Sequence, residues 1–228
     1  MTTKHIPELI SFNVCPFVQR SAIALIEKNA KFTTTYIDLK NPPDWFADVS
    51  PLGKVPVLRI GDAIIFESAV IAEYLDERYA PNLHPTNLIS KAHHRSWTEF
   101  ASDITNNMFM MLYAKTEESF KELQSKIKKQ LHQVEQVIDK QGPLFAGEHF
   151  SLVDAAYAPV FLRLDLVDQV YKLNLFEYES RLGLWSSELL KRNSVKASVV
   201  DDFEEIFFSY NKNSGGYLAE QIALNDQV

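Results

Sequence analysis

The sequence predicts an α/β fold in the N-terminal third of the chain and an all-helical fold in the remainder. Strand and helix signals alternate through the first 80 residues. No convincing strand signal follows Asn87, where long helical patterns take over. The chain has 228 residues, 46% of them hydrophobic and 23% charged, so it is long enough for two small globular domains.

The N-terminal elements are expected in the order βαβ-α-ββ-α. Runs of β-branched, aliphatic and aromatic residues predict strands at 9–12, 32–37, 55–60 and 63–66. Apolar periodicity and turn residues predict helices at 16–29, 45–49 and from 68 to about 79. Gly61-Asp62 is a two-residue hairpin signal between the last two strands. This order implies a mixed four-stranded sheet with parallel and antiparallel parts.

The rest of the chain is expected to be helical. Helical patterns cover 88–114, 117–140, 182–191 and 202–210, and residues 211–216 read as a flexible turn. Ser151 and Asp154 have the spacing of a capping box before the apolar segment 155–167. We therefore predict an N-terminal domain over 1–81, a linker over 82–86 and a helical domain over 87–228.

Composition limits the classes of function. The net charge of −7 gives no reason to expect nucleic acid as a partner. A single cysteine rules out an internal disulfide framework and argues against a cysteine-based metal cluster, so no metal is expected. Residues 1–5 are polar, and no apolar run approaches the roughly 18 residues of a membrane span. We expect a cytoplasmic protein without stable membrane insertion.

The single cysteine, Cys15, lies between the first strand and the first helix. Pro16 suits the first turn of a helix, which places Cys15 at the helix N-terminus. Unpaired backbone N–H groups there favour an anion, and Arg20 can add positive charge, so we expect the pKa of Cys15 to lie below its ordinary value. A lone cysteine can also be a packing residue. The strand–Cys-Pro–helix context favours a reactive thiol.

Two further positions indicate a ligand site. Pro56 stands at a strand start, which predicts a cis peptide bond that turns the backbone of Val55 toward an extended ligand. The alternative for Pro56 is an ordinary edge-strand proline. Glu67 and Ser68 open a helix, where an N-terminus suits a carboxylate. Taken alone, these two residues would read as a helix-capping pair.

Together these motifs resemble the cytosolic glutathione transferases, especially the cysteine-type classes typified by omega. The similarity covers nearly the whole chain. Its specific segments are Cys-Pro-Phe-Val-Gln-Arg at 15–20 and the stretches 38–41, 43–46, 50–58 and 66–75. The resemblance implies a thioredoxin-like N-terminal domain, an all-helical C-terminal domain, glutathione as co-substrate and a homodimer.

The resemblance also implies roles for single residues. Cys15 matches the catalytic cysteine, and Phe17 beside it is expected in the glutathione site. Val55 matches the residue whose backbone pairs with the cysteinyl part of glutathione. Glu67 and Ser68 match the pair that holds the γ-glutamyl end.

The chain departs from the omega pattern at Pro42. Omega-like proteins have a lysine at this position, which meets the glycyl carboxylate of glutathione. Lys40 or Lys54 is expected to replace that lysine, and the choice between them stays open. Val18 stands where dithiol glutaredoxins carry a second cysteine. A mixed disulfide at Cys15 must therefore be resolved by a second glutathione.

The resemblance implies a glutathione-dependent thiol transferase that acts on a small disulfide or electrophile such as dehydroascorbate. Conjugation of glutathione to a xenobiotic is the alternative among enzymes. Two non-enzymatic alternatives share the fold: membrane-associating proteins like the intracellular chloride channels, and transcription-associated starvation proteins. The segment 66–68 argues against the first and Cys15 against the second. Candidates for either the co-substrate cleft or plain core are Phe109, Met110, Tyr113 and Trp185.

Overall fold

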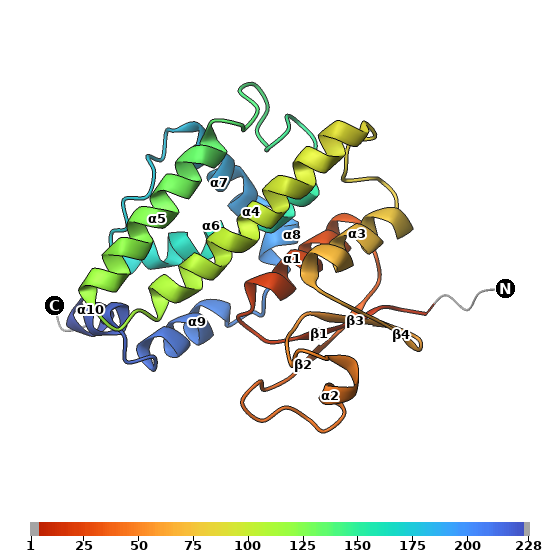
Figure 1. Ribbon diagram of the computed structural model, residues 1–228, viewed down its shortest axis with the longest axis horizontal. Coiled ribbons are helices and arrows are strands. Elements are labelled where there is room, and N and C mark those ends of the chain that lie inside the picture. The colour runs from red at the N-terminus through yellow and green to blue at the C-terminus, as the bar shows by residue number, and fades with distance from the viewer. Residues whose placement is uncertain (1–4, 226–228) are drawn as a thin grey trace.

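The computed structural model describes residues 5–225 and consists of two parts (Figure 1). A four-stranded sheet with helices α1 to α3 forms a thioredoxin-like N-terminal domain, and helices α4 to α10 form the second part. The predicted fold class is therefore confirmed. The expectation of a cytoplasmic location rested partly on residues 1–5, and residues 1–4 lie outside the described residues.

The sheet has the strand order β2-β1-β3-β4. The central strand β1 pairs parallel with β2 and antiparallel with β3, and β3 pairs antiparallel with β4. This is the mixed sheet that the element order predicts. The strands are β1 (Glu8–Ser11), β2 (Thr33–Tyr36), β3 (Val57–Ile60) and β4 (Ala63–Phe66).

Helix α1 (Pro16–Glu27) lies between the sheet and the helical domain, beside α3 (Ser68–Arg78) (Figure 1). It contacts α3 within its own domain and α6 (Leu152–Val170) and α8 (Asn193–Lys196) of the helical domain. Residues 18–25 of α1 are all buried, and this run includes polar side chains. A helix covered on both sides brings polar groups into the interface, where each needs a partner. The short helix α2 (Phe46–Val49) follows β2.

Helix α6 forms the centre of the helical domain, and its first turn has the predicted capping box. The N–H and hydroxyl groups of Ser151 donate to Oδ2 of Asp154, at 2.8 and 2.6 Å. Oδ1 of Asp154 accepts the indole N–H of the buried Trp185 at 2.7 Å. The other helices are α4 (Leu88–Leu112), α5 (Glu117–Glu135), α7 (Arg181–Lys191), α9 (Phe203–Lys212) and α10 (Tyr217–Asn225).

The structure corrects the predicted elements in two places. Helix α5 ends at Glu135 and not near residue 140, and Asp139 accepts the backbone N–H groups of Gln141 and Gly142 in a turn. The turn predicted at 211–216 is shorter, because helix α9 continues to Lys212 and residues 213–216 form the turn before α10. The N–H of Tyr217 donates to the carbonyl of Ala114 at 2.8 Å and holds this segment against the end of α4. The predictions also omitted the short helix α8 and helix α10.

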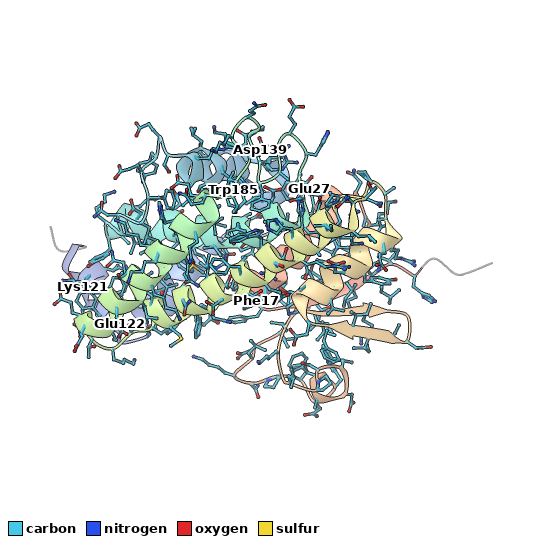
Figure 2. All side chains as sticks on the ribbon, turned by 45° about the horizontal axis from the view of Figure 1, so that its top comes forward. Phe17, Glu27, Lys121, Glu122, Asp139 and Trp185 are labelled. Atoms are coloured by element: carbon cyan, nitrogen blue, oxygen red, sulfur yellow. The ribbon has the colours of Figure 1, made fainter. Side chains whose placement is uncertain are left out.

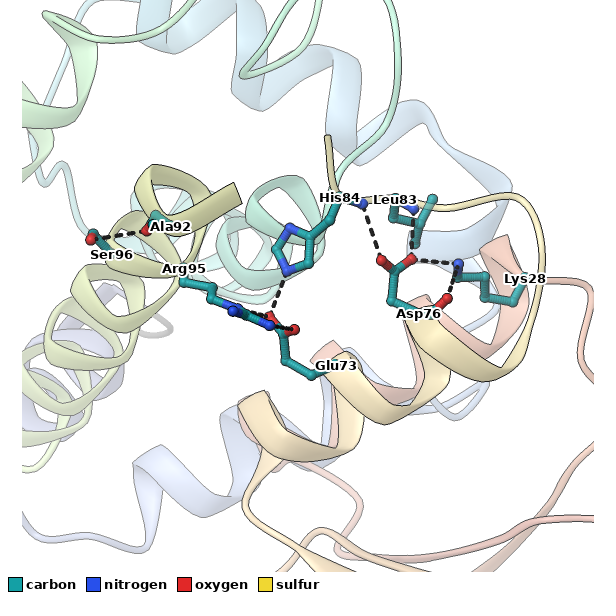
Figure 3. Close-up of polar contacts among 8 residues, drawn as sticks. All are labelled: Lys28, Glu73, Asp76, Leu83, His84, Ala92, Arg95 and Ser96. Atoms are coloured by element: carbon teal, nitrogen blue, oxygen red, sulfur yellow. Dashed lines mark hydrogen bonds and ion pairs between the residues drawn. The ribbon is translucent and has the colours of Figure 1, made fainter. Parts of the chain in front are cut away.

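The segment between α3 and α4 is held by buried charges (Figure 3). The carboxylate of Asp76 accepts the N–H groups of Leu83 and His84 at 2.6 and 3.2 Å, and it pairs with Lys28. The His84 ring contacts Glu73, 2.5 Å away. Both Leu83 and His84 are buried. We propose residues 82–86 as the linker between domains 1–81 and 87–228.

Candidate functional site

A cavity of about 420 Å³ opens between the N-terminal domain and helix α4. Five of the residues predicted for a ligand site line it: Phe17, Lys54, Val55, Glu67 and Ser68. The opposite wall comes from α4, through Glu99, Ser102 and Asn106. Figure 2 shows Phe17 at this junction. The cavity is therefore shared between the two parts of the molecule.

Cys15 occupies the N-cap position of α1 and does not itself line this cavity, but it contacts Val55, which does. Its thiol donates to the carbonyl oxygen of Val55, with Sγ and O 3.8 Å apart. The backbone N–H groups of Phe17 and Val18 also interact with the sulfur and favour its thiolate form. Pro16 is the first residue of α1, as the sequence predicts. On its other side Cys15 lines a small cavity of about 50 Å³, together with Tyr36 of β2 and Arg163 of α6.

Burial raises the pKa of the Cys15 thiol above its ordinary value. The N–H groups of Val18 and Phe17 and the charges of Arg163 and Arg20 act in the opposite direction, because each favours the thiolate. The expectation of a lowered pKa is therefore wrong for this structure. The helix N-terminus is present as predicted, but loss of water around the sulfur outweighs it.

Glu67 and Ser68 occupy the start of α3 without capping it. Within the described chain, the Glu67 side chain makes no hydrogen bond to the first turn of the helix, which argues against the capping alternative. Its backbone has φ 68°, a left-handed conformation that non-glycine residues adopt at a cost of about 1–3 kcal/mol. The Glu67 side chain is exposed, whereas Ser68 is buried and its hydroxyl accepts from Nη1 of Arg20 at 3.4 Å.

The two lysines with an open assignment have different positions. Lys54 lines the cavity, and its N–H and C=O groups both bond to the hydroxyl of Ser50, at 2.8 and 2.7 Å. Lys40 is exposed and is not among the residues that line the cavity. Its N–H donates to a carboxylate oxygen of Asp38 at 2.9 Å. The peptide bond between Val55 and Pro56 is cis, as predicted.

Two buried arginines lie near Cys15, and the sequence indicated only one of them. Arg20, which we expected to add positive charge near the sulfur, is 2% exposed and donates to the hydroxyl of Ser102 on α4 at 3.1 Å. Arg163 is also 2% exposed, and it was not singled out at all. The available signal was an arginine within the predominantly apolar segment 155–167, which also contains Asp165, since a buried cation in such a segment needs partners from elsewhere in the fold.

The four aromatic and methionine candidates separate into core and surface. Trp185 is fully buried inside the helical domain, so it belongs to the core (Figure 2). Phe109 and Met110 are more than half exposed. Tyr113 is partly buried, with its ring centroid 4.6 Å from that of Phe109.

Over residues 5–225, no group of three or more His, Cys, Asp or Glu side chains is placed to hold a metal ion. No helix in this range combines the length and the apolar character that a membrane crossing requires.

Comparison with known proteins connects this geometry to a family. Residues 14–78 match the model for the "Glutathione S-transferase, N-terminal domain", and residues 117–185 match that for the C-terminal domain. The chain is 31% identical over 191 residues to glutathione S-transferase omega-1 of Sus scrofa, covering 82% of this chain and 78% of the relative.

Two solved structures are similar over most of the chain. Glutathione transferase Omega 3C from Trametes versicolor superimposes with a TM-score of 0.75 at 28% identity, over 86% of this chain and 89% of that one. A glutathione S-transferase from Methylobacillus flagellatus, solved with gsh bound, gives a TM-score of 0.75 at 25% identity, over 85% and 98%. The chain belongs to the glutathione S-transferase family.

Proposed function

We propose that this protein is a glutathione-dependent thiol transferase in which Cys15 is the nucleophile and glutathione the co-substrate. The observation that carries the proposal is the position of the Cys15 sulfur. It lies at a helix N-terminus, 3.8 Å from the carbonyl oxygen of Val55, a residue that lines a cavity large enough for a tripeptide. A serine or tyrosine there could only hydrogen-bond a glutathione thiolate, whereas a cysteine can form a disulfide with it.

The cavity offers complementary groups for each part of glutathione. The backbone of Val55 is suited to pair with the cysteinyl part. The Glu67 carboxylate can accept from the ammonium group of the γ-glutamyl end, and Ser68 at the start of α3 suits its carboxylate. Lys54 is the better choice for the glycyl carboxylate, since Lys40 is outside the lining.

The reaction has two displacement steps. The Cys15 thiolate attacks the glutathionyl sulfur of a mixed disulfide, so that a Cys15–glutathione disulfide forms and the other thiol leaves and takes up a proton. The thiolate of a second glutathione then attacks the glutathionyl sulfur on Cys15. Oxidised glutathione is released and the Cys15 thiolate is restored. Glutathione supplies both electrons, because Val18 leaves no second thiol in the motif.

Conjugation of glutathione to an electrophile is the second candidate, favoured by the raised pKa of Cys15. A protonated Cys15 can donate a hydrogen bond to a bound glutathione thiolate, which is the role that conjugation requires. The Cys15→Ser variant separates the two functions. It loses thiol transfer and keeps conjugation of a chromogenic electrophile if both reactions occur at this site.

We also propose a homodimer in which the N-terminal domain of one subunit meets the helical domain of the other. Apolar side chains next to the cavity support it: Leu52, Phe66 and Val70 are 58%, 43% and 53% exposed. Light scattering at micromolar concentration should give twice the mass of the chain. A monomer mass would exclude the proposal.

The central experiment is incubation with oxidised glutathione followed by intact mass measurement. One glutathionyl group should be added to the wild type, none to Cys15→Ser, and reduced glutathione should remove it. A wild type that forms no adduct, or a Cys15→Ser variant with full thiol-transferase activity, would show that Cys15 is not the nucleophile.

A further inference from the structure

Arg163 is a buried cation without an acidic partner. It lies in the middle of α6, is 2% exposed, and forms no ion pair with any carboxylate among the side chains that the structure describes. Its guanidinium lies over the ring of Phe203, with Cζ 5.0 Å from the centroid. A buried charge with only neutral neighbours lowers the stability of the fold, so its presence calls for a structural or functional reason.

The hydrogen bonds of Arg163 lead to the turn that carries Cys15. Nη2 donates to the carbonyl of Val14 at 2.9 Å, and Nη1 donates to Oε1 of Gln19 at 2.6 Å. A third bond, to the carbonyl of Pro159 at 2.8 Å, anchors the guanidinium to its own helix. Val14 precedes Cys15 in the chain, and Gln19 lies in the first turn of α1. One side chain of the helical domain therefore fixes both sides of the Cys15 turn.

Arg163 and Cys15 also share the small cavity of about 50 Å³ behind the sulfur. Gln19 lines the same cavity and donates through Nε2 to the hydroxyl of Ser198, at 3.1 Å. Burial lowers the pKa of the Arg163 guanidinium to about 10, and the charge of Cys15 is what opposes that effect. The arginine and the thiolate thus each stabilise the charged form of the other.

We infer that Arg163 is a positioning residue for Cys15, which holds the turn before the sulfur and supplies from the helical domain the positive charge that favours the thiolate. This inference rests on the proposed function, in which Cys15 is the nucleophile. It makes the reactivity of Cys15 depend on the docking of α6 against the N-terminal domain. A thioredoxin-like domain without its helical partner would lack this charge.

Other groups also face Cys15, and their effects on the thiol have to be distinguished from that of Arg163. The charge of Arg20 on α1 also favours the Cys15 thiolate. Its hydrogen bonds, however, go to Ser68 and Ser102, which line the large cavity. Tyr36 of β2 also lines the small cavity, and burial raises the pKa of its hydroxyl. The N–H groups of Phe17 and Val18 are unchanged by a substitution in α6.

The test is the pH dependence of iodoacetamide labelling at Cys15 in the full chain, followed by intact mass. We expect Arg163→Gln and Arg163→Met to move the rate profile to higher pH and to slow labelling at about pH 8 roughly tenfold. Arg163→Lys keeps the charge and should stay near the wild-type profile. Arg163→Gln retains a hydrogen-bond donor for Val14, so it tests the charge even if Arg163→Met does not fold.

Arg192→Met is the matched control. Arg192 also joins the helical domain to α1, through two bonds of 3.0 Å to the carboxylate of Glu27. Glu27 is the last residue of α1, about 18 Å along the helix from Cys15. Loss of a contact between the domains alone should therefore leave the labelling profile of Cys15 unchanged. Circular dichroism at each pH establishes which variants are folded.

Two results would overturn the inference. The first is a folded Arg163→Gln or Arg163→Met variant whose profile coincides with that of the wild type. The second is an Arg163→Lys profile displaced as far as that of Arg163→Gln, which would leave only a packing role. Iodoacetamide needs no glutathione, so this readout is independent of the adduct experiment. Failure of the wild type to form the adduct would refute the proposed function instead.

Discussion

The Sγ atom of Cys15 lies 3.8 Å from the carbonyl oxygen of Val55, although 40 positions separate the two residues in the chain. The contact joins the start of α1 to the loop before β3, and Val55 also lines the large cavity. A peptide ligand that pairs with the backbone of Val55 therefore has its central residue next to the Cys15 sulfur.

Substitution of Glu67 or Ser68 by Ala should weaken glutathione binding by about 1–3 kcal/mol each, because each change removes a partner of a charged group. Isothermal calorimetry measures the change. Glu122→Ala, on the exposed face of α5, is the matched control and should bind as the wild type does (Figure 2). Unchanged affinity in both site variants would refute the assignment of the γ-glutamyl end.

Glu67→Gly should unfold at a higher denaturant concentration than Glu67→Ala. The backbone of Glu67 has φ 68°, which glycine adopts without the steric cost that a Cβ brings. We expect a difference of about 1 kcal/mol in the free energy of unfolding, measured in urea. Both variants should bind glutathione equally weakly. Equal stability of the two would mean that the conformation of Glu67 carries no strain.

Labelling of Cys15 by iodoacetamide should accelerate as pH rises, through a midpoint above that of a free cysteine. The thiolate is the reactive form, and burial raises the pKa of this thiol. A small free thiol such as N-acetylcysteine, labelled under the same conditions, provides the reference. A protein midpoint below the reference would show that the helix N-terminus and the two arginines outweigh burial.

Lys28→Met should destabilise the protein by about 3–5 kcal/mol, since it leaves the Asp76 carboxylate buried without its cation. Nζ of Lys28 lies 2.5 Å from Asp76 and also donates to the carbonyl of Tyr79 at 2.7 Å. Lys121→Met is the control, because its pair with Glu117 is exposed on α5 (Figure 2). Urea denaturation should separate the two variants clearly. Similar midpoints would mean that water reaches the Lys28 pair.

The stability of the protein should fall as pH drops from about 6.5 to about 4, with His94 as one cause. Burial lowers the pKa of His94 to about 4, and the charges of His84 and His93 add to that effect. Over this range the unfolded chain binds a proton at His94 that the folded protein excludes, so acid favours unfolding.

His94→Phe should reduce this loss of stability. Nδ1 of His94 has no hydrogen-bond partner among the described residues, and the ring already packs against Phe145, so phenylalanine suits the site. Thermal denaturation at about pH 7 and pH 5 measures the difference. His132→Phe, at an exposed position of α5, should behave as the wild type does. An unchanged pH dependence in His94→Phe would exclude His94 as a source.

Local sequence patterns predict most of the helices and strands and five of the residues that line the large cavity. Pro16 after Cys15 predicts a helix start, Gly61-Asp62 predicts the β3–β4 hairpin, and Ser151 with Asp154 predicts the start of α6. Backbone conformation at such positions depends on the residue itself and on its neighbours in the chain. Such signals depend only on a few consecutive residues, so they can be recognised without knowledge of the fold.

The electrostatic environment of the Cys15 sulfur depends on tertiary contacts and could not be predicted from local sequence. The pKa of Cys15 depends on how much water its neighbours exclude and on charges such as Arg163, which is 148 positions away in the chain. The position of Trp185 also depends on tertiary contacts. Its sequence context allows either a cleft or a core position, and in the fold its N–H donates to Asp154 inside the core. Desolvation and charge act through space, so residues far apart in the sequence set them, and no local pattern records which ones will meet.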